Sequence, residues 1–406
     1  MSGAIERGAD DGSALTRLTG IPVPDFARDH WGEHPLLTRH GGGFDDLFSA
    51  DAVDDLVADR GLRTPFVRMA AEGSVLAPSL FTASGGFGAE IGDQLDSEKV
   101  LTQFAGGATL VLQGLHRTWR PIADFTRALA LEIGHPIQVN AYITPASSRG
   151  FDPHYDTHDV FVIQIAGAKH WTIHEPVHRH PLADQPWTDH RSAVAARAQD
   201  QPVIDAVFEP GDVLYLPRGW IHSAVAQGGT SIHLTIGVKA TTRHDVLMRL
   251  LRRGGEDDAL RMPLPLGAGT GDGELTADAS AIASAIHDIG NSLDGEALAA
   301  AAHGIFEQSV RAAPVRPLST VDLLGSLGAA TVVGWRSALA ARIRDDEQTV
   351  RITLPGKTLT LPLEASAAVR ALRDHDLAAG SLPGLDVDSS LVVARRLLRE
   401  GVVVPR

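Results

Sequence analysis

Three side chains near the middle of the chain combine residue types and a spacing that could bind a transition metal. His154 and Asp156 are separated by one residue, and side chains two positions apart on a β-strand lie on the same face. Tyr155 would then point to the opposite face. A third ligand, His222, could come from a later strand in the stretch GDVLYLPRGWIHSA. Two histidines and one carboxylate form the facial triad of non-haem Fe(II) oxygenases, which leaves positions open for a co-substrate and O2.

Other metals and cofactors are restricted by the residues around this triplet. Zinc binding through His154 and His158, four residues apart, would need a helix, and Pro153 and the β-rich flanks argue against one. The chain contains no cysteine. Disulfides, thiolate zinc sites, cysteine-ligated iron–sulfur clusters and a cysteine nucleophile are therefore excluded, and any metal must be bound by His, Asp or Glu.

The region from Pro136 to Ala240 contains many short segments that are typical of β-strands. We expect strands at Gln138–Thr144, Val160–Ala166, His170–His174, Val213–Leu216 and Ser231–Val238. Ala166-Gly167-Ala168 and Glu209-Pro210-Gly211-Asp212 each separate two apolar runs, and we interpret both as hairpin turns. Many short strands with turn signals between them indicate a sandwich or a barrel.

Helical patterns lie on both sides of this β-rich block. Residues 1–20 are predicted to be a flexible tail, and residues 21–240 a β-barrel domain with N-terminal helices such as Ala50–Asp59 and Ile122–Leu131. Residues 241–312 are predicted to be a helical segment. It contains an amphipathic helix at His244–Arg253, a glycine-rich loop at Gly267–Gly273 and an alanine-rich helical stretch at Ala277–Val310.

Residues 313–406 form a smaller predicted unit. The expected order is a helix at Val321–Leu327, a strand, a Pro355-Gly356-Lys357 turn, a second strand, helices at Leu363–Asp374 and Ser389–Glu400, and a closing strand at Val402–Val404. Helices combined with a small hairpin predict a winged-helix domain.

Composition and charge narrow the classes of function. The chain has 406 residues, of which 44% are hydrophobic and 21% charged, as expected for two or three globular domains. No run is apolar enough for a membrane span, and the polar N-terminus has no signal-peptide core, so we expect a cytoplasmic protein without membrane association. The net charge is −14, which repels nucleic acid and favours basic partners. From Arg316 onward it is only +2, which argues against DNA binding by the winged helix.

The stretch from Asn140 to Gly237 resembles the JmjC domain of the ribosomal oxygenase family. The resemblance is carried by NAYITPASSRGFDPHYDTHDVFVIQIAGAKHW, FEPGDVLYLPRGWIHSA and SIHLTIG, and it extends to FARDHWGEHPLL at Phe26–Leu37. It implies a double-stranded β-helix barrel of the cupin type, followed by a helical dimerisation segment and a winged helix. The chain is therefore expected to be mainly β with added helices, and to form a homodimer.

The resemblance also implies roles for individual residues. His154, Asp156 and His222 match the three iron ligands of the family. Lys169 matches the basic residue that binds the distal carboxylate of 2-oxoglutarate. This role is physically sensible, because a buried ammonium needs an anion. Asn140 and Tyr142 match active-site positions that would contact the co-substrate, and His233 lies on a strand near the site.

The expected activity is hydroxylation of a protein side chain with Fe(II) as cofactor and 2-oxoglutarate as co-substrate. In the family the substrates are arginine or histidine residues of ribosomal proteins, so a basic protein partner is expected. Two other classes of protein stay open. One is a metal-binding cupin with non-oxidative chemistry, in which Lys169 would have no assigned role. The other is a non-enzymatic binding protein that uses its winged helix.

Overall fold

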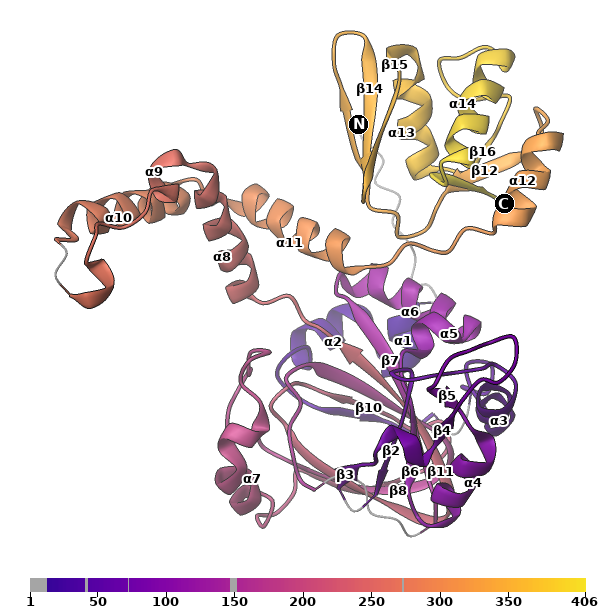
Figure 1. The fold of residues 1–406 in the computed structure, drawn as a ribbon, viewed down its shortest axis with the longest axis vertical. Helices are drawn as coiled ribbons and strands as arrows, with labels where there is room; N and C mark the ends of the chain where they lie inside the picture. Colours follow the sequence, from indigo (N-terminus) through magenta and orange to yellow (C-terminus); the bar gives the residue numbers. More distant parts are fainter. Residues whose placement is uncertain (1–12, 41–42, 72, 147–151, 272–273) are drawn as a thin grey trace. The chain divides into compact units, whose positions relative to one another are not determined.

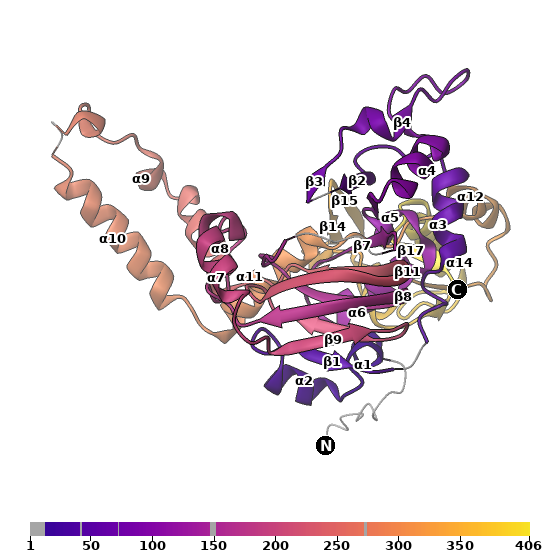
Figure 2. The same ribbon diagram turned by 90° about the horizontal axis from the view of Figure 1, so that it is seen from below.

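Two long antiparallel strands, β8 (Asp159–His174) and β11 (Ile221–Val238), form the centre of the N-terminal part of the protein (Figure 2). Both are rich in β-branched residues, and β8 also contains Phe161 and Trp171; such residues favour strands. The structure is a computed structural model that describes residues 13–40, 43–71, 73–146, 152–271 and 274–406. It divides into two units, residues up to Ala240 and residues from Thr241, and each is described by itself (Figure 1).

One large sheet is built around the central pair. Its strand order is β1-β10-β8-β11-β7-β6-β2-β3, and β9 also pairs with β8. The bounds of the other strands in this sheet are β1 Leu36–Thr38, β2 Val67–Ala71, β3 Ser74–Val75, β6 Thr109–Leu112, β7 Ile137–Thr144, β9 Ile204–Phe208 and β10 Val213–Leu216. A separate pair is formed by β4 (Thr82–Ala83) and β5 (Gln94–Leu95). The unit is therefore a mixed α/β structure with a β-sheet core.

One face of the sheet is covered by N-terminal helices. Alternate side chains of β8, such as Phe161 and Ile163, join the main hydrophobic core on this face, whereas Val160 and Val162 face the other way. The helices are α1 Ala14–Thr19, α2 Val23–Asp29, α3 Ala50–Ala58, α4 Ser97–Ala105, α5 Leu115–Thr118 and α6 Arg120–Ile133. The expected helices at Ala50–Asp59 and Ile122–Leu131 correspond to α3 and α6. The opposite face of the sheet is left to line a cavity.

The two expected hairpin turns in this region are wrong. β8 runs without a turn through Gly167, where its pairing with β11 shifts register. Gly167 has a φ of 62°, so it forms a bulge instead of a turn. The stretch from Glu209 to Asp212 links β9 to β10, and both of these strands pair with β8 in the same direction. The glycines therefore mark irregularities within the sheet and not reversals of the chain.

The bulge at Gly167 changes which side chains of β8 face the cavity. Before it, Val160 and Val162 line the cavity, and after it Lys169 and Trp171 do. The residues of β8 that face the cavity thus have even numbers before the bulge and odd numbers after it. A regular strand would keep one parity throughout and would turn Lys169 to the outer face.

The prediction of a flexible tail over residues 1–20 is also wrong for the part that the structure describes. Residues 1–12 lie outside the described residues, but α1 begins at Ala14 and buries Leu18 completely. The carboxylate of Glu132 on α6 accepts hydrogen bonds from the backbone N–H groups of Ala14 and Leu15, both at 2.9 Å. This carboxylate accepts hydrogen bonds from free N–H groups in the first turn of α1, and it interacts favourably with the positive end of the helix dipole.

The second unit begins with helices. A capping box between Thr242 and Asp245 starts α8 (Arg243–Leu251), which packs with α11 (Gly295–Ser309) through a small apolar cluster. The expected stretch Ala277–Val310 is two helices, α10 (Thr276–Asn291) and α11, because Asp294 caps a new helix. Short helices η3 (Arg252–Glu256), α9 (Asp258–Arg261) and η4 (Ala268–Thr270) lie between α8 and α10. The last two residues of the expected loop Gly267–Gly273 lie outside the described residues.

Residues from Pro317 onward have a hydrophobic core of their own. The elements are α12 Pro317–Ser326, β12 Val332–Trp335, β13 Arg342–Asp345, β14 Thr349–Leu354, β15 Lys357–Pro362, α13 Ser366–Asp374, β16 Leu377–Ala378, α14 Val387–Arg399 and β17 Val403–Pro405. β14 and β15 form a hairpin through the turn expected at Pro355-Gly356. Within the described ranges, no helix of either unit is long and apolar enough to cross a membrane.

Replacing Gly167 by alanine should destabilise the N-terminal unit strongly. A Cβ atom there would lie 2.2 Å from the backbone oxygen of Thr230, in addition to the strain of a positive φ. Gly228 is the matched control, because its φ is 75° but a Cβ would meet nothing within 4 Å. We expect Gly228→Ala to cost about 1–2 kcal/mol of unfolding free energy and Gly167→Ala roughly 1–3 kcal/mol more. Chemical denaturation measures both, and equal losses would contradict the role of the bulge.

Candidate metal centre and its cavity

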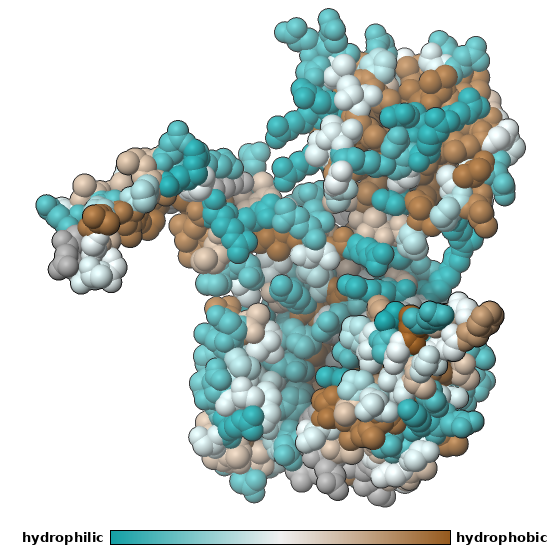
Figure 3. All heavy atoms as spheres, viewed as in Figure 1, coloured by the Kyte–Doolittle hydropathy of each residue, from teal (hydrophilic) through white to brown (hydrophobic). Residues whose placement is uncertain are grey.

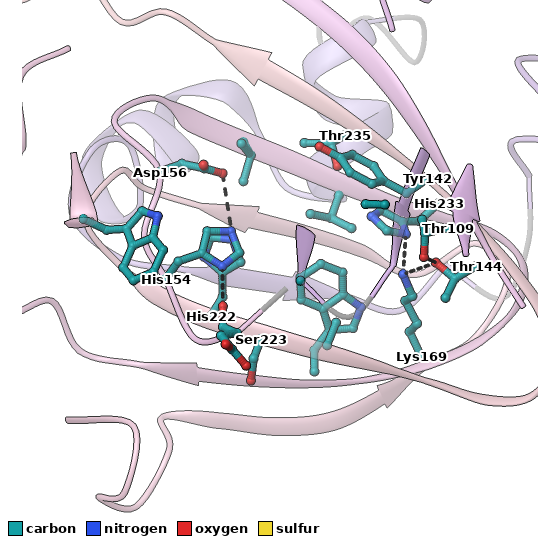
Figure 4. A pocket seen from close by; sticks show the side chains of 18 of the residues that line it. Thr109, Tyr142, Thr144, His154, Asp156, Lys169, His222, Ser223, His233 and Thr235 are labelled. Carbon is teal, nitrogen blue, oxygen red and sulfur yellow. Dashed lines mark hydrogen bonds and ion pairs between the residues drawn. The ribbon is translucent and has the colours of Figure 1, made fainter. Parts of the chain in front are cut away.

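The sheet encloses a cavity of about 470 Å³ on the face opposite the helices. Its lining comes from β2, β6, β7, β8 and β11, together with the segment before β8 and the short helix η2 (Trp187–His190), which precedes α7 (Arg191–Arg197). Figure 4 shows two polar groups inside it, with His154, Asp156 and His222 together and Lys169 with its partners elsewhere along the wall. The cavity therefore contains a candidate metal centre and a separate cationic group.

His154, Asp156 and His222 form the only potential metal cluster among the described residues. Their ligand atoms all lie within 4.8 Å of one another, and Nε2 of His222 is 3.8 Å from Oδ2 of Asp156. Small rotations of these side chains would bring the three onto one ion. The expectation that a regular strand carries His154 and Asp156 is wrong in detail, because His154 forms an isolated bridge with His222.

This bridge positions the two histidines. The N–H of His222 donates to the carbonyl of His154 at 2.8 Å, and the reverse hydrogen bond is 3.2 Å long. The N–H of Gly219 donates to the carbonyl of Asp156 at 3.0 Å. Three backbone hydrogen bonds thus join the HxD segment to the start of β11, although the two segments are far apart in the sequence.

Both imidazole rings are oriented by the same kind of contact. Nδ1 of His154 lies 2.7 Å from the carbonyl of Asp152, and Nδ1 of His222 lies 3.1 Å from the carbonyl of Trp220. A carbonyl can only accept, so each Nδ1 carries the proton and each ring presents Nε2 as the coordinating atom. Each carbonyl belongs to the residue two positions before its histidine.

The electrostatics of the cluster suit a bound cation. Burial, together with the neighbouring His154, lowers the pKa of His222 to about 4, so this ring is neutral at physiological pH. Burial alone would raise the pKa of Asp156, but the imidazoles of His222, His158 and His154 outweigh it and the pKa is lowered. An ionised carboxylate beside neutral imidazoles is the protonation state in which these groups bind metals.

The residues around the HxD segment face away from the cluster. Tyr155 is almost fully buried on the other side, where its hydroxyl donates to the carbonyl of Gln185 at 3.1 Å. His158 packs on Gly237 of β11 and does not belong to the metal cluster. His170 pairs with Asp205 at the surface, and burial lowers the pKa of His174. Neither residue lines the cavity.

Lys169 is a buried cation without a carboxylate partner among the described residues. It is 3% exposed, and its Nζ donates to Oγ1 of Thr144 at 3.0 Å and lies 3.3 Å from Nδ1 of His233. Burial lowers the pKa of Lys169 to about 7. Burial and the charge of Lys169 together hold the pKa of His233 well below its usual value, so His233 is neutral and can accept. An anion that entered the cavity would compensate the ammonium.

Asn140 and Tyr142, the other two expected site residues, differ in position. Tyr142 lines the cavity, and its ring stacks on His233 with centroids 5.0 Å apart. Asn140 is not among the lining residues. Its Oδ1 accepts from the N–H of Gly114 at 3.1 Å. Asn140 therefore supports the cavity wall from behind.

Several lining residues escaped the sequence analysis. They include Arg68, Thr109, Thr144, Trp171, Trp187 and Arg191. Arg68 had one available signal, which is a charged residue between the apolar residues Val67 and Met69 of a short strand. The guanidinium of Arg191 lies over the ring of Trp187 at 4.9 Å, so both belong to one side of the cavity.

The donor set fits Fe(II) better than the common alternatives. Two imidazole nitrogens and one carboxylate oxygen on one side of an open cavity match the facial triad of non-haem Fe(II) oxygenases. A structural zinc site would be closed by four protein ligands, and the cluster supplies three. The remaining coordination positions face the cavity in which Lys169 lies.

Comparison with known proteins relates the region that holds this site to a known domain. Residues 115–246 match the JmjC domain. The chain is 28% identical over 250 residues to the bifunctional lysine-specific demethylase and histidyl-hydroxylase NO66 of Drosophila persimilis, covering 58% of this chain and 32% of that protein. It is 40% identical over 117 residues to ribosomal oxygenase 1 of Homo sapiens, covering 28% of this chain and 17% of that protein. The chain thus spans a third or less of the length of these relatives.

Solved structures extend the likeness to the whole fold. The ribosomal oxygenase YcfD of Escherichia coli aligns over 95% of this chain and 98% of its own, with 18% identity and a TM-score of 0.56. Its complex with cobalt and 2-oxoglutarate aligns with a TM-score of 0.54 and the same coverage. At this identity the likeness shows the fold alone, which is a cupin-type JmjC fold. Residues 115–246 thus match a JmjC domain, and over this region the chain is similar to proteins named as ribosomal oxygenases and histidyl-hydroxylases.

Removing one ligand side chain should abolish metal binding without unfolding the sheet. Asp156→Ala removes the carboxylate and His222→Ala one imidazole, and we expect either to weaken Co(II) binding at least about a hundred-fold. The d–d absorption of bound Co(II) and isothermal titration calorimetry measure this loss. His170→Ala is the matched control, because His170 lies outside the cavity in an exposed pair with Asp205. Co(II) binding by His222→Ala equal to that of the control would refute the cluster as the metal site.

Proposed function

We propose that this protein is an Fe(II)- and 2-oxoglutarate-dependent oxygenase that hydroxylates a side chain of a ribosomal protein. The observation that carries the proposal is the buried ammonium of Lys169, which lacks a carboxylate partner in the described structure and faces the same cavity as the metal cluster. A metal-binding cupin with non-oxidative chemistry would not need such a cation. The complex of YcfD with cobalt and 2-oxoglutarate supports the same assignment.

The overall reaction balances with one co-substrate. The substrate C–H, O2 and 2-oxoglutarate give the alcohol, succinate and CO2, so that one oxygen atom enters the substrate and the other enters succinate. Fe(II), held by His154, Asp156 and His222, would supply the activation of O2. The protein's own groups bind and orient the reactants. Lys169 and Thr144 would bind the distal carboxylate, and the apolar wall with Val162 and Trp171 excludes water.

A basic protein is the substrate class that the charge favours. Without the +2 of the residues from Arg316 onward, the remainder of the chain carries −16. An acidic surface speeds encounters with cationic partners, and this attraction weakens as salt is added. The relatives named ribosomal oxygenase support a ribosomal substrate, and ribosomal proteins are typically basic. Such an enzyme would act in the cytoplasm.

The remaining residues would serve assembly and not chemistry. We infer that residues 241–312 are a dimerisation segment and residues 313–406 a winged-helix domain, in which the β14–β15 hairpin is the wing. The helical segment exposes hydrophobic side chains (Figure 3). Leu247 of α8 and Ile286 of α10 are 50% and 54% exposed. A second copy of the chain would cover them.

The activity is tested by 2-oxoglutarate turnover with peptides. Iron-loaded protein should convert 2-oxoglutarate to succinate, and mass spectrometry should detect added oxygen on fragments of basic ribosomal proteins. We expect these peptides to be better substrates than free arginine or histidine, and the advantage to shrink as salt rises. Equal hydroxylation of a free amino acid, without salt dependence, would contradict a protein substrate. No succinate above the level of His222→Ala would overturn the oxygenase assignment.

Lys169→Met isolates the contribution of the ammonium to the same assay. We expect the Michaelis constant for 2-oxoglutarate to rise about ten- to a hundred-fold, because a charged hydrogen bond is worth roughly 1.5–3 kcal/mol. In the wild type, binding should also weaken above pH 7, since unliganded Lys169 has a pKa of about 7 and loses its proton there. The methionine variant should lose this pH dependence. An unchanged Michaelis constant would remove Lys169 from the co-substrate site.

Lys169→Met should at the same time stabilise the unliganded protein. The pKa of Lys169 is lower in the folded protein than its usual value of 10.5, so the unfolded chain binds the proton more tightly. Stability of the wild type therefore rises with pH between about 7 and 10.5 and is lowest below that window. The variant has no such cost and should gain about 1–3 kcal/mol at neutral pH. Urea denaturation at several pH values measures the gain.

Dimerisation is tested by placing charge on the exposed face of α10. Ile282 and Ile286 lie one turn apart and are both exposed. Replacing both by aspartate should convert a dimer to a monomer in light scattering at micromolar concentration. Ser284→Asp adds charge to the same helix at another exposed position and should leave the dimer intact. A wild-type monomer at this concentration would refute the dimer.

A further inference from the structure

Arg68 is a cationic side chain of the cavity that has no role in the proposed reaction. Arg68 lies on β2, where Val67 and Met69 point into the main core and Arg68 and Ala70 line the cavity. Its Nε is buried and has no hydrogen-bond acceptor among the described residues. An arginine is rarely buried with a donor unpaired, because the cost of an unsatisfied polar group is high. The vacant Nε–H is therefore available to an acceptor that enters the cavity.

Tyr142 connects Arg68 to the metal centre. The guanidinium of Arg68 lies close enough to the Tyr142 hydroxyl to act on its pKa. Burial is the main cause that raises the pKa of Tyr142, the charge of Asp156 raises it further, and the charge of Arg68 opposes both. Charges act on a hydroxyl in this way only at short range. Arg68 and the metal ligand Asp156 therefore lie near the same phenol in one cavity.

The charges around this part of the cavity are mostly positive. The described lining contains three cations, Lys169, Arg68 and Arg191, and two carboxylates, Asp152 and Asp156. Asp156 belongs to the metal cluster, and the two charges of 2-oxoglutarate would offset those of Fe(II). Asp152 is exposed at the rim. No carboxylate of the described lining is left beside Arg68 to neutralise a second guanidinium.

We propose that Arg68 selects the substrate side chain by charge and hydrogen bonding, admitting neutral histidine and excluding arginine and lysine. The proposal rests on the proposed oxygenase function and specifies which residue that site accepts. A neutral imidazole has one nitrogen that accepts, so it can take the vacant Nε–H of Arg68. Guanidinium and ammonium groups only donate, and they would add like charge beside Arg68. Arg68 is thus a specificity-determining residue and takes no part in oxygen chemistry.

The test compares matched peptide libraries that differ only in the central residue, which is histidine, arginine or lysine between identical randomised flanks. Wild-type protein should hydroxylate the histidine library at least about tenfold more efficiently than either other library. Binding is measured separately by calorimetry on Mn(II)-loaded protein with N-oxalylglycine, an analogue of 2-oxoglutarate that is not turned over. Equal or better binding of the arginine library by the wild type would overturn the proposal.

Substitutions at position 68 separate charge from hydrogen bonding. Arg68→Lys keeps the charge and loses Nε, so it should still reject arginine peptides but bind histidine peptides more weakly. Arg68→Gln removes the charge and should reduce the preference for histidine over arginine peptides. Arg68→Glu should reduce or reverse this preference. Arg60→Glu makes the same charge change on an exposed arginine outside the cavity and should leave the preference unchanged. A histidine-to-arginine ratio that is the same in Arg68→Gln and wild type would refute the role of Arg68.

Two further measurements distinguish a failure of the proposal for Arg68 from a failure of the proposed oxygenase function. Peptide-independent conversion of 2-oxoglutarate to succinate reports on the iron and co-substrate sites, in which the proposal gives Arg68 no part. Its absence in the wild type would defeat the proposed function, whereas the calorimetric preference would still decide the role of Arg68. Loss of this basal turnover in Arg68→Gln, with a folded protein and unchanged peptide preference, would assign Arg68 to 2-oxoglutarate and overturn the selection of substrate.

Discussion

The antiparallel pairing of β8 with β11 is the constraint on which the rest of the site depends. One register sets His222 opposite Ile173 and Lys169 opposite Ala226, so it fixes where the metal ligand and the ammonium lie along the cavity. A slip by one residue would turn either side chain to the outer face of the sheet. The bulge at Gly167 lets β8 place Lys169 inward without disturbing the core packing of Phe161 and Ile163. Register and bulge therefore determine the site together.

In addition to the strand register, short-range contacts hold the metal ligands, and the two histidines have contacts of the same kind. Backbone hydrogen bonds join His154 to His222, and each ring is oriented by the carbonyl two residues before it. These contacts fix the imidazole tautomers before any ion is bound. The cluster needs only small side-chain rotations, which lowers the entropy cost of binding a metal. The co-substrate end of the cavity differs, since Lys169 depends on a hydroxyl and a neutral imidazole and has no charged partner in the described structure.

The sequence predicts this site unevenly, and the reason is the range over which each feature is determined. The HxD triplet and the strand before His222 are local patterns, so the ligand set and the JmjC resemblance can be recognised from the chain alone. Gly167 is ambiguous, because a turn and a bulge both need a positive φ and only the partner strand decides between them. Leu18 seemed part of a tail because the carboxylate that starts its helix, Glu132, is more than a hundred residues away. Arg68 could not be placed for the same reason.

The unsatisfied groups in the cavity share one chemical character. The ammonium of Lys169 lacks a carboxylate, Nε of Arg68 lacks an acceptor, and so does Nε1 of Trp171, all within the described residues. Each is a donor, and each raises the free energy of the unliganded protein. Apolar residues at these positions would give a more stable core but no affinity for polar ligands. Because these vacancies outside the metal cluster are donors, anions and neutral acceptors gain from binding to them, while cationic side chains gain nothing there and meet repulsion. The features that destabilise the unliganded protein therefore also determine which molecules it binds.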